Sequence, residues 1–181
     1  MQGSSYNTLQ NNTANNNTYH GIEIYDITST NNNIIKNIVN NNSWSGISLR
    51  SVLGNNVLIG NTANNNNEYG IDLGSAGSSN VLNNNIANNN KKYGIFIHYS
   101  NNNLLFNNDL VNNAINDAYD TNDNNQWDSG SEGNHYSDYL GTDSNGDGIG
   151  DTPYPIPGGS SVDRYPLMTP YSPQPSDYEG K

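Results

Sequence analysis

The sequence predicts an all-β solenoid, a single-stranded parallel β-helix of about five 24-residue coils with an irregular C-terminal cap. Three observations predict this fold: Gly-Ile pairs recur at nearly constant spacing, asparagine precedes each pair at set distances, and each repeat contains only short apolar pieces. The pairs begin at Gly21, Gly46, Gly70 and Gly94, so the first interval is longer than the next two by a single position. We expect a degenerate fifth start one interval later, at Ala118-Tyr119.

The composition leaves two classes of chain open. Of 181 residues, 40 are asparagine and 31% are hydrophobic, which is typical of a disordered, β-aggregating chain or of a repeat protein with a narrow core. The register favours the repeat protein, because three features keep a constant distance before each start. An asparagine pair lies five to six residues before it, an Asn or Asp lies nine residues before it, and an apolar residue lies twelve residues before it. These positions are Asn15-Asn16, Asn40-Asn41, Asn64-Asn65, Asn88-Asn89 and Asn112-Asn113; Asn12, Asn37, Asn61, Asn85 and Asp109; and Leu9, Ile34, Leu58, Leu82 and Phe106.

Each repeat is expected to form one coil of short strands. The repeat has no 3.6-residue apolar period and is too short for two helices, whereas pieces such as IEI and VLI have strand character. Stacked coils place equivalent residues about 4.8 Å apart, so the isoleucines of the Gly-Ile pairs form an interior row. Asparagine tolerates left-handed backbone angles and bonds to turn amides, so runs such as 64–67 are expected at the corners, stacked as ladders.

The pattern N…I..N..…NN…yGI.L, over roughly residues 5–125, resembles the repeat of the NosD-like family of carbohydrate-binding and sugar-hydrolase β-helices. The resemblance implies a right-handed β-helix. It selects no single activity, because that family includes lyases, hydrolases, epimerases, adhesins and accessory proteins. The NosD name is associated with copper delivery. The chain has no Cys, and Met1, Met168, His20, His98 and His135 are scattered, so we do not expect a copper site.

The outward side of the Gly-Ile strands is the candidate ligand site. Alternate residues of a strand point outward. The expected outward rows are Glu23, Ser48, Asp72, Phe96 and Asp120, and Tyr25, Arg50, Gly74 and His98. From these rows, the residues expected to contact a polysaccharide or glycan are Tyr25, Arg50, Asp72, Phe96 and His98. Enzymes that resemble this fold commonly place polysaccharide sites on such a side.

Two functions remain open for this side, and ordinary solvated positions are a third interpretation. If the chain is an enzyme, a polysaccharide lyase or glycoside hydrolase, Asp72 would act as acid or base, Arg50 would pair with a uronate carboxylate, and His98 would assist. A hydrolase needs a second carboxylate, and Glu23 is two coils away, about 9.6 Å by sheet spacing, which is marginal. We therefore favour a non-catalytic structural or glycan-binding module.

The segment GTDSNGDGIGDTPYPI predicts a calcium loop. Asp143, Asn145 and Asp147 alternate, Gly148 follows, Ile149 would offer its carbonyl, and Asp151 a direct or water-mediated contact. The segment resembles calcium loops of dockerin-like and thrombospondin-like repeats. Its twelfth position is Tyr154 instead of Glu, so the remaining ligand would come from Asp138 or Asp163, or be absent. A metal-free Gly/Asp turn is the alternative; bound Ca²⁺ would have a structural role.

The period disappears after Trp127, so we expect three parts: coils over 1–127, a calcium loop and cap over 128–170, and a linker or tail over 171–181. Residues 1–117 hold six acids against four bases, and residues 118–181 eleven against two. This balance argues against nucleic acid, and no apolar run of 18 residues indicates membrane insertion.

The C-terminal part resembles the ends of β-helix domains in microbial surface proteins, so an extracellular or cell-surface location is expected. An uncovered first coil implies either preceding coils or assembly of copies into an oligomer or filament.

Overall fold

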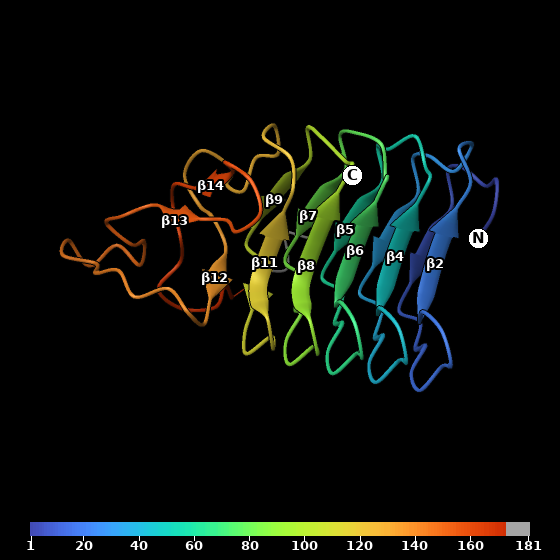
Figure 1. Ribbon diagram of the computed structural model, residues 1–181, viewed down its shortest axis with the longest axis horizontal. Coiled ribbons are helices and arrows are strands. Elements are labelled where there is room, and N and C mark those ends of the chain that lie inside the picture. The colour runs from blue at the N-terminus through green and yellow to red at the C-terminus, as the bar shows by residue number, and fades with distance from the viewer. Residues whose placement is uncertain (173–181) are drawn as a thin grey trace.

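The computed structural model describes residues 1–172 and confirms the predicted right-handed β-solenoid of about five turns. The coils lie side by side in Figure 1, from the N-terminus at the right to an irregular cap at the left. One parallel sheet contains β1 (Thr8–Gln10), β3 (Asn33–Ile35), β5 (Val57–Ile59), β7 (Val81–Asn83) and β9 (Leu104–Phe106). The second, here called the Gly-Ile sheet, contains β2 (Ile22–Tyr25), β4 (Ile47–Arg50), β6 (Ile71–Gly74), β8 (Tyr93–His98) and β11 (Asn116–Asp120).

The core is a set of aliphatic rows between the two sheets. Ile71 pairs in register with Ile47 and Ile95, and Leu58 pairs with its counterparts in the neighbouring coils. These side chains are fully buried, while alternate residues point outward. The core is thus renewed coil by coil, and the sheets hold the outward side chains in rows.

Three rows of asparagine, buried in the middle coils, stabilise the corners, as the sequence predicts. In each row the side-chain Nδ2 of one Asn donates to Oδ1 of the Asn in the next coil, at 2.8–3.2 Å. The rows are Asn7, Asn32, Asn56, Asn80, Asn103 and Asn125; Asn12, Asn37, Asn61, Asn85, Asn108 and Asn134; and Asn17, Asn42, Asn66, Asn90 and Asn113. Because these amides also accept backbone N–H groups, they satisfy corner donors that would otherwise be buried without partners.

Each asparagine row ends on a carboxylate at the C-terminal side. Asn125 donates to Asp120 at 3.0 Å, Asn134 to Asp163 at 3.2 Å, and Asn113 to Asp117 at 3.0 Å. An ionised carboxylate has only acceptors. It therefore satisfies the last donor of a row without requiring a further coil.

The predicted register of the fifth coil is wrong by one residue. Ala118 pairs with Ile95 and is buried, so it is an interior residue and not the equivalent of the glycine; Tyr119 points outward, and Asp120 pairs with Ile97 and is buried. Leu105 and Asn108, and not Phe106 and Asp109, continue the interior rows.

The cause is a shortened corner. Gly74 pairs with His98 at the usual repeat interval, whereas Ser78 pairs with Asn101, an interval shorter by a single position. The longer first interval, from Gly21 to Gly46, arises at the same corner, between the Tyr25–Arg50 and Thr30–Gly54 pairs. Both of these changes in repeat length therefore occur at the corner after the Gly-Ile strands.

The cap packs aromatic side chains against the last coil. Tyr136 and Tyr154 stack with ring centroids 3.9 Å apart, and both join Trp127 and Ile156 in the core cluster. The short strands here are β10 (Asp109–Leu110), which pairs with β12 (His135–Tyr136), and β13 (Tyr154–Pro155), which pairs antiparallel with β14 (Val162–Asp163). Apart from Tyr171 and Ser172, the predicted linker lies outside the described residues.

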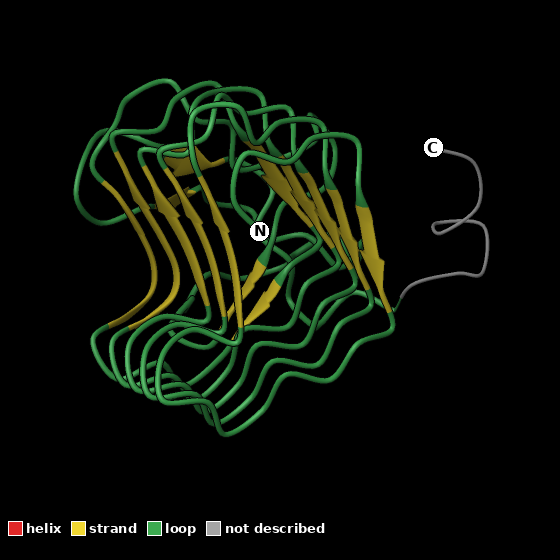
Figure 2. Ribbon diagram, turned by 90° about the vertical axis from the view of Figure 1, so that its right-hand side faces the viewer, coloured by secondary structure: helices red, strands yellow, loops and turns green. Residues whose placement is uncertain are grey.

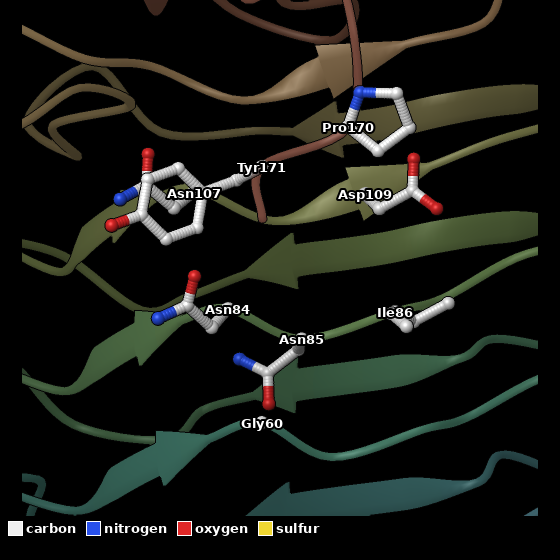
Figure 3. Close-up of a pocket in the computed structure, with 8 residues that line it drawn as sticks. All are labelled: Gly60, Asn84, Asn85, Ile86, Asn107, Asp109, Pro170 and Tyr171. Carbon is white, nitrogen blue, oxygen red and sulfur yellow. The ribbon is translucent and has the colours of Figure 1, made fainter. Parts of the chain in front are cut away.

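The chain leaves the cap along the outside of the solenoid. Pro170 and Tyr171 lie near Asn84 and Asn107 and help to line a pocket of about 120 Å³ with them (Figure 3). The pocket is small compared with typical ligand sites, which measure about 300–1,000 Å³. Within residues 1–172, no helix has the length and apolar character needed to cross a membrane.

Candidate functional site

The outer side of the Gly-Ile sheet, here called the Gly-Ile face, gathers most of the predicted site residues. Its strands bend towards the interior in Figure 2, so this side is concave. Four outward rows cross it, counted from the glycine of each coil. Two residues before the glycine lie Tyr19, Trp44, Glu68, Lys92 and Ile115, and one residue before it lie His20, Ser45, Tyr69, Tyr93 and Asn116. Two residues after the glycine lie Glu23, Ser48, Asp72, Phe96 and Tyr119, and four residues after it lie Tyr25, Arg50, Gly74 and His98.

Asp72 lies at the centre of this face and connects two predicted site residues. Its carboxylate accepts hydrogen bonds from Ser48 Oγ at 3.3 Å and Arg50 Nε at 3.4 Å, and His98 Nε2 is 3.6 Å from its Oδ1. Asp72 is fully buried, whereas the side chains of Arg50 and His98 are 40% and 30% exposed. Asp72 therefore positions Arg50 and His98, which alone of the three can touch a ligand.

Gly74 provides the space for this arrangement. A Cβ at position 74 would lie 2.6 Å from His98 Nε2 and 3.4 Å from Asp72 Oδ1. A larger residue in the row between Arg50 and His98 would therefore move the imidazole away from the carboxylate. The structure thus brings Arg50, Asp72 and His98 together, as the register predicts.

Phe96 lies within a stack of rings instead of standing alone. Tyr69, Tyr93 and His98 lie 4.6, 5.2 and 4.8 Å from it between ring centroids, with planes within 28° of parallel. Tyr119 extends the stack on Tyr93. Rings at these distances cover one another's faces, so this group stabilises the neighbouring coils and offers mainly ring edges to solvent.

Three aromatic side chains on the first two coils are far more accessible. Trp44 is 41% exposed and Tyr25 46% exposed, and Tyr19 is also exposed. Tyr19 and His20 approach Trp44 with their planes at 88° and 79° to it, so neither lies flat on the indole. The sequence prediction missed Tyr19 and Trp44 because it counted only the rows after the glycine. Their common position two residues before it was the available signal.

His20 and Ser45 lie beside Trp44 with unused hydrogen-bonding atoms. His20 Nδ1 accepts the backbone N–H of Ser45 at 3.2 Å, which leaves the ring hydrogen on Nε2. Burial lowers the pKa of His20, so its ring is neutral at pH 7. His20 Nε2 and Ser45 Oγ are buried without a partner among the described residues.

Lys92, on the same face, forms an ion pair with a carboxylate, as Arg50 does. Lys92 Nζ lies 2.7 Å from Glu68 and 5.3 Å from the centre of the Tyr69 ring. The hydrogen bond to Glu68 raises the pKa of Lys92. Both Arg50 and Lys92 therefore already have a carboxylate as a neighbour, which leaves little unbalanced positive charge here.

A comparison with protein families identifies the chain. The model of a family described as periplasmic copper-binding protein (NosD) matches residues 1–141. The chain belongs to the NosD family. No curated protein sequence matches it.

In the predicted calcium loop of this NosD-family chain, the aspartates accept hydrogen bonds from other groups of the same loop. Asp143 accepts the backbone N–H groups of Gly146 and Gly148 at 2.7 and 2.9 Å. Asp147 accepts the side chain of Asn145 at 2.9 Å and the backbone N–H of Ile149 at 2.9 Å. Asp151 instead accepts the hydroxyl and N–H of Ser144. Within residues 1–172, no three His, Asp or Glu side chains are grouped so that they could hold a metal.

Asp163, one of the carboxylates that close the asparagine rows of this NosD-family chain, is fully buried. Asp163 accepts the N–H of Asn134 at 2.7 Å and the hydroxyl of Tyr136 at 3.0 Å. Burial nevertheless raises the pKa of Asp163 to about 6. The two alternative calcium ligands are engaged elsewhere: Asp163 closes a row, and Asp138 accepts the hydroxyl of Tyr154 at 2.9 Å.

Proposed function

We propose that this chain is a non-catalytic β-solenoid module that binds a glycan on its Gly-Ile face. The observation that supports it is the gathering of accessible aromatic rings and oriented polar groups on one concave side. Pyranose rings present C–H groups to an aromatic face and hydroxyls to polar neighbours, and Tyr and Trp combine an apolar body with a polar tip. A location outside the cytoplasm fits the family's periplasmic description; a place at the cell surface is part of the proposal.

A glycan array followed by titration tests the proposal. The purified chain should bind a subset of oligosaccharides, and prolonged incubation should leave them chemically unchanged. An array without any bound glycan would reject the binding function. Release of shorter products would reject the non-catalytic part.

Catalysis by a polysaccharide lyase or hydrolase is the second candidate, because Arg50, Asp72 and His98 meet on this face. The burial of Asp72 disfavours it, since an acid or base must come within hydrogen-bonding reach of its substrate. The Asp72→Asn variant separates the two functions. It should retain glycan binding in altered strength if the role is positional, whereas an enzyme would lose turnover.

Structural calcium binding in the loop of Asp143, Asn145, Asp147, Ile149 and Asp151 remains a prediction. Ca²⁺ favours six to eight oxygen ligands, and a bound ion would exchange the internal hydrogen bonds of the loop for such contacts. End-to-end association also remains a prediction. The cap covers the last coil, so association would use the edge of the first.

Copper is not part of the proposal, although the family description names it. Copper prefers soft sulfur ligands or imidazole. The chain has three His, two Met and no Cys. His20 and His98 are on different coils of the Gly-Ile face, and His135 Nδ1 lies 2.7 Å from Asp109 in the cap. This donor set does not fit a copper site.

A further inference from the structure

The location and chemical class of the glycan subsite can be taken further, on the basis of the proposed function. A sugar that stacks on an aromatic residue needs a ring face that no other ring covers. Phe96 fails this condition, because three nearly parallel rings lie within 5.2 Å of its centroid. Trp44 is the better candidate, because it is 41% exposed and no ring of the described chain stacks parallel to its indole.

Tyr25 provides a second accessible ring at the other end of the same strands. It is the register partner of Arg50 and is nearly half exposed. Trp44 and Arg50 are six residues apart, at most about 20 Å along an extended chain. A ligand that contacts both ends must therefore be an oligosaccharide, because one sugar reaches only one ring.

Polar groups lie beside each ring. Next to Trp44, the Nε2–H of His20 and the hydroxyl of Ser45 are buried and have no partner in residues 1–172. Both atoms are buried, as the carboxylate of Asp72 is, so they form the surroundings of the indole without contacting a ligand. Next to Tyr25, Arg50 is held by Asp72 and exposes 40% of its side chain.

The charges of this region favour a neutral ligand. Arg50 is already compensated by Asp72, and Lys92 by Glu68. Glu23 lies exposed between the two rings. A glycan with carboxylates or sulfates would be repelled by Glu23, while the side-chain cations Arg50 and Lys92 already have carboxylate partners.

We propose that Trp44, with Tyr19 beside it, and Tyr25 form a subsite on the first two coils for a neutral oligosaccharide, whose hydroxyls bind Arg50. The longer axis of the ligand follows the strands from Trp44 towards Tyr25. Affinity therefore rises from monosaccharide to oligosaccharide until both rings are covered.

The test combines four variants with calorimetric titration of neutral oligosaccharides from the array and of uronic-acid oligosaccharides of equal length. Trp44→Ala and Tyr25→Ala should each weaken binding of the neutral ligand about tenfold or more, the effect of losing one aromatic contact. Phe96→Leu, in the ring stack, and Tyr6→Ala, an exposed tyrosine before the other sheet, should remain within about twofold. Melting curves verify that each variant is folded.

The possible outcomes separate this subsite from the broader proposal. If no glycan binds the parent chain, both proposals are wrong. If a glycan binds and Trp44→Ala and Tyr25→Ala retain full affinity, the function stands and the subsite is wrong. If only uronic-acid oligosaccharides bind, the neutral class is wrong.

Discussion

Asn61 lies in the middle of an asparagine row, and its replacement by alanine removes four buried hydrogen bonds. Its Oδ1 accepts both the backbone N–H and the side chain of Asn37, and its Nδ2 donates to Ile34 O and Asn85 Oδ1. All four distances lie between 2.8 and 3.0 Å. At about 1 kcal/mol for each bond, the free energy of unfolding should fall by about 4 kcal/mol. This is a large share of the roughly 5–15 kcal/mol typical of a folded domain.

Urea denaturation followed by far-ultraviolet circular dichroism measures this loss. The matched control is Asn67→Ala, because Asn67 is exposed and belongs to none of the buried rows. The control should change the free energy of unfolding by less than about 0.5 kcal/mol. If Asn61→Ala lost no more than the control, the rows would not stabilise the fold, and the explanation of the asparagine-rich sequence would be wrong.

Three further predictions concern the cap and the ring stack. The pKa of Asp163 is about 6 when folded and 3.8 when unfolded, so protonation favours the folded state. Asp163 should therefore increase the free energy of unfolding by up to about 3 kcal/mol as pH falls from 7 to 4. Asp163→Asn should lose that increment in a pH series of urea melts; an unchanged series would contradict it. Calcium should raise the melting temperature relative to chelator if the loop binds it, and Asp147→Asn should reduce this shift; equal melting temperatures with and without chelator would reject the site. Phe96→Ala should cost about 2 kcal/mol of stability through lost ring contacts, measured by urea denaturation, with Tyr6→Ala as its exposed control.

The fold follows from the sequence because one unit is repeated. Each of Ile47, Ile71 and Ile95 occupies the same environment, so their spacing alone defines the coil and its inner side. The fifth coil escaped prediction because its register depends on a corner that is shorter by one residue, and a deletion there shifts every later position. Alanine fits both the glycine position and the isoleucine position of the repeat, so the residue type of Ala118 does not reveal its register.

The candidate site was predictable where strand alternation defines it and not elsewhere. Arg50, Asp72 and His98 follow from the alternation and do meet on one side. The burial of Asp72 and the covering of Phe96 depend on which neighbouring side chains lie over them, and spacing does not encode that. Trp44 precedes its strand, and strand alternation does not predict to which side a side chain outside the strand points.

The carboxylate at the end of each asparagine row makes the solenoid directional. Within the rows every coil offers the same amide donors to the next, so an internal coil can be duplicated or deleted by recombination without new hydrogen-bonding chemistry. Asp117, Asp120 and Asp163 cannot be moved inward in the same way, because a carboxylate has no hydrogen to pass on to another coil. The number of internal coils can therefore change, whereas the three carboxylates that end the asparagine rows must be kept.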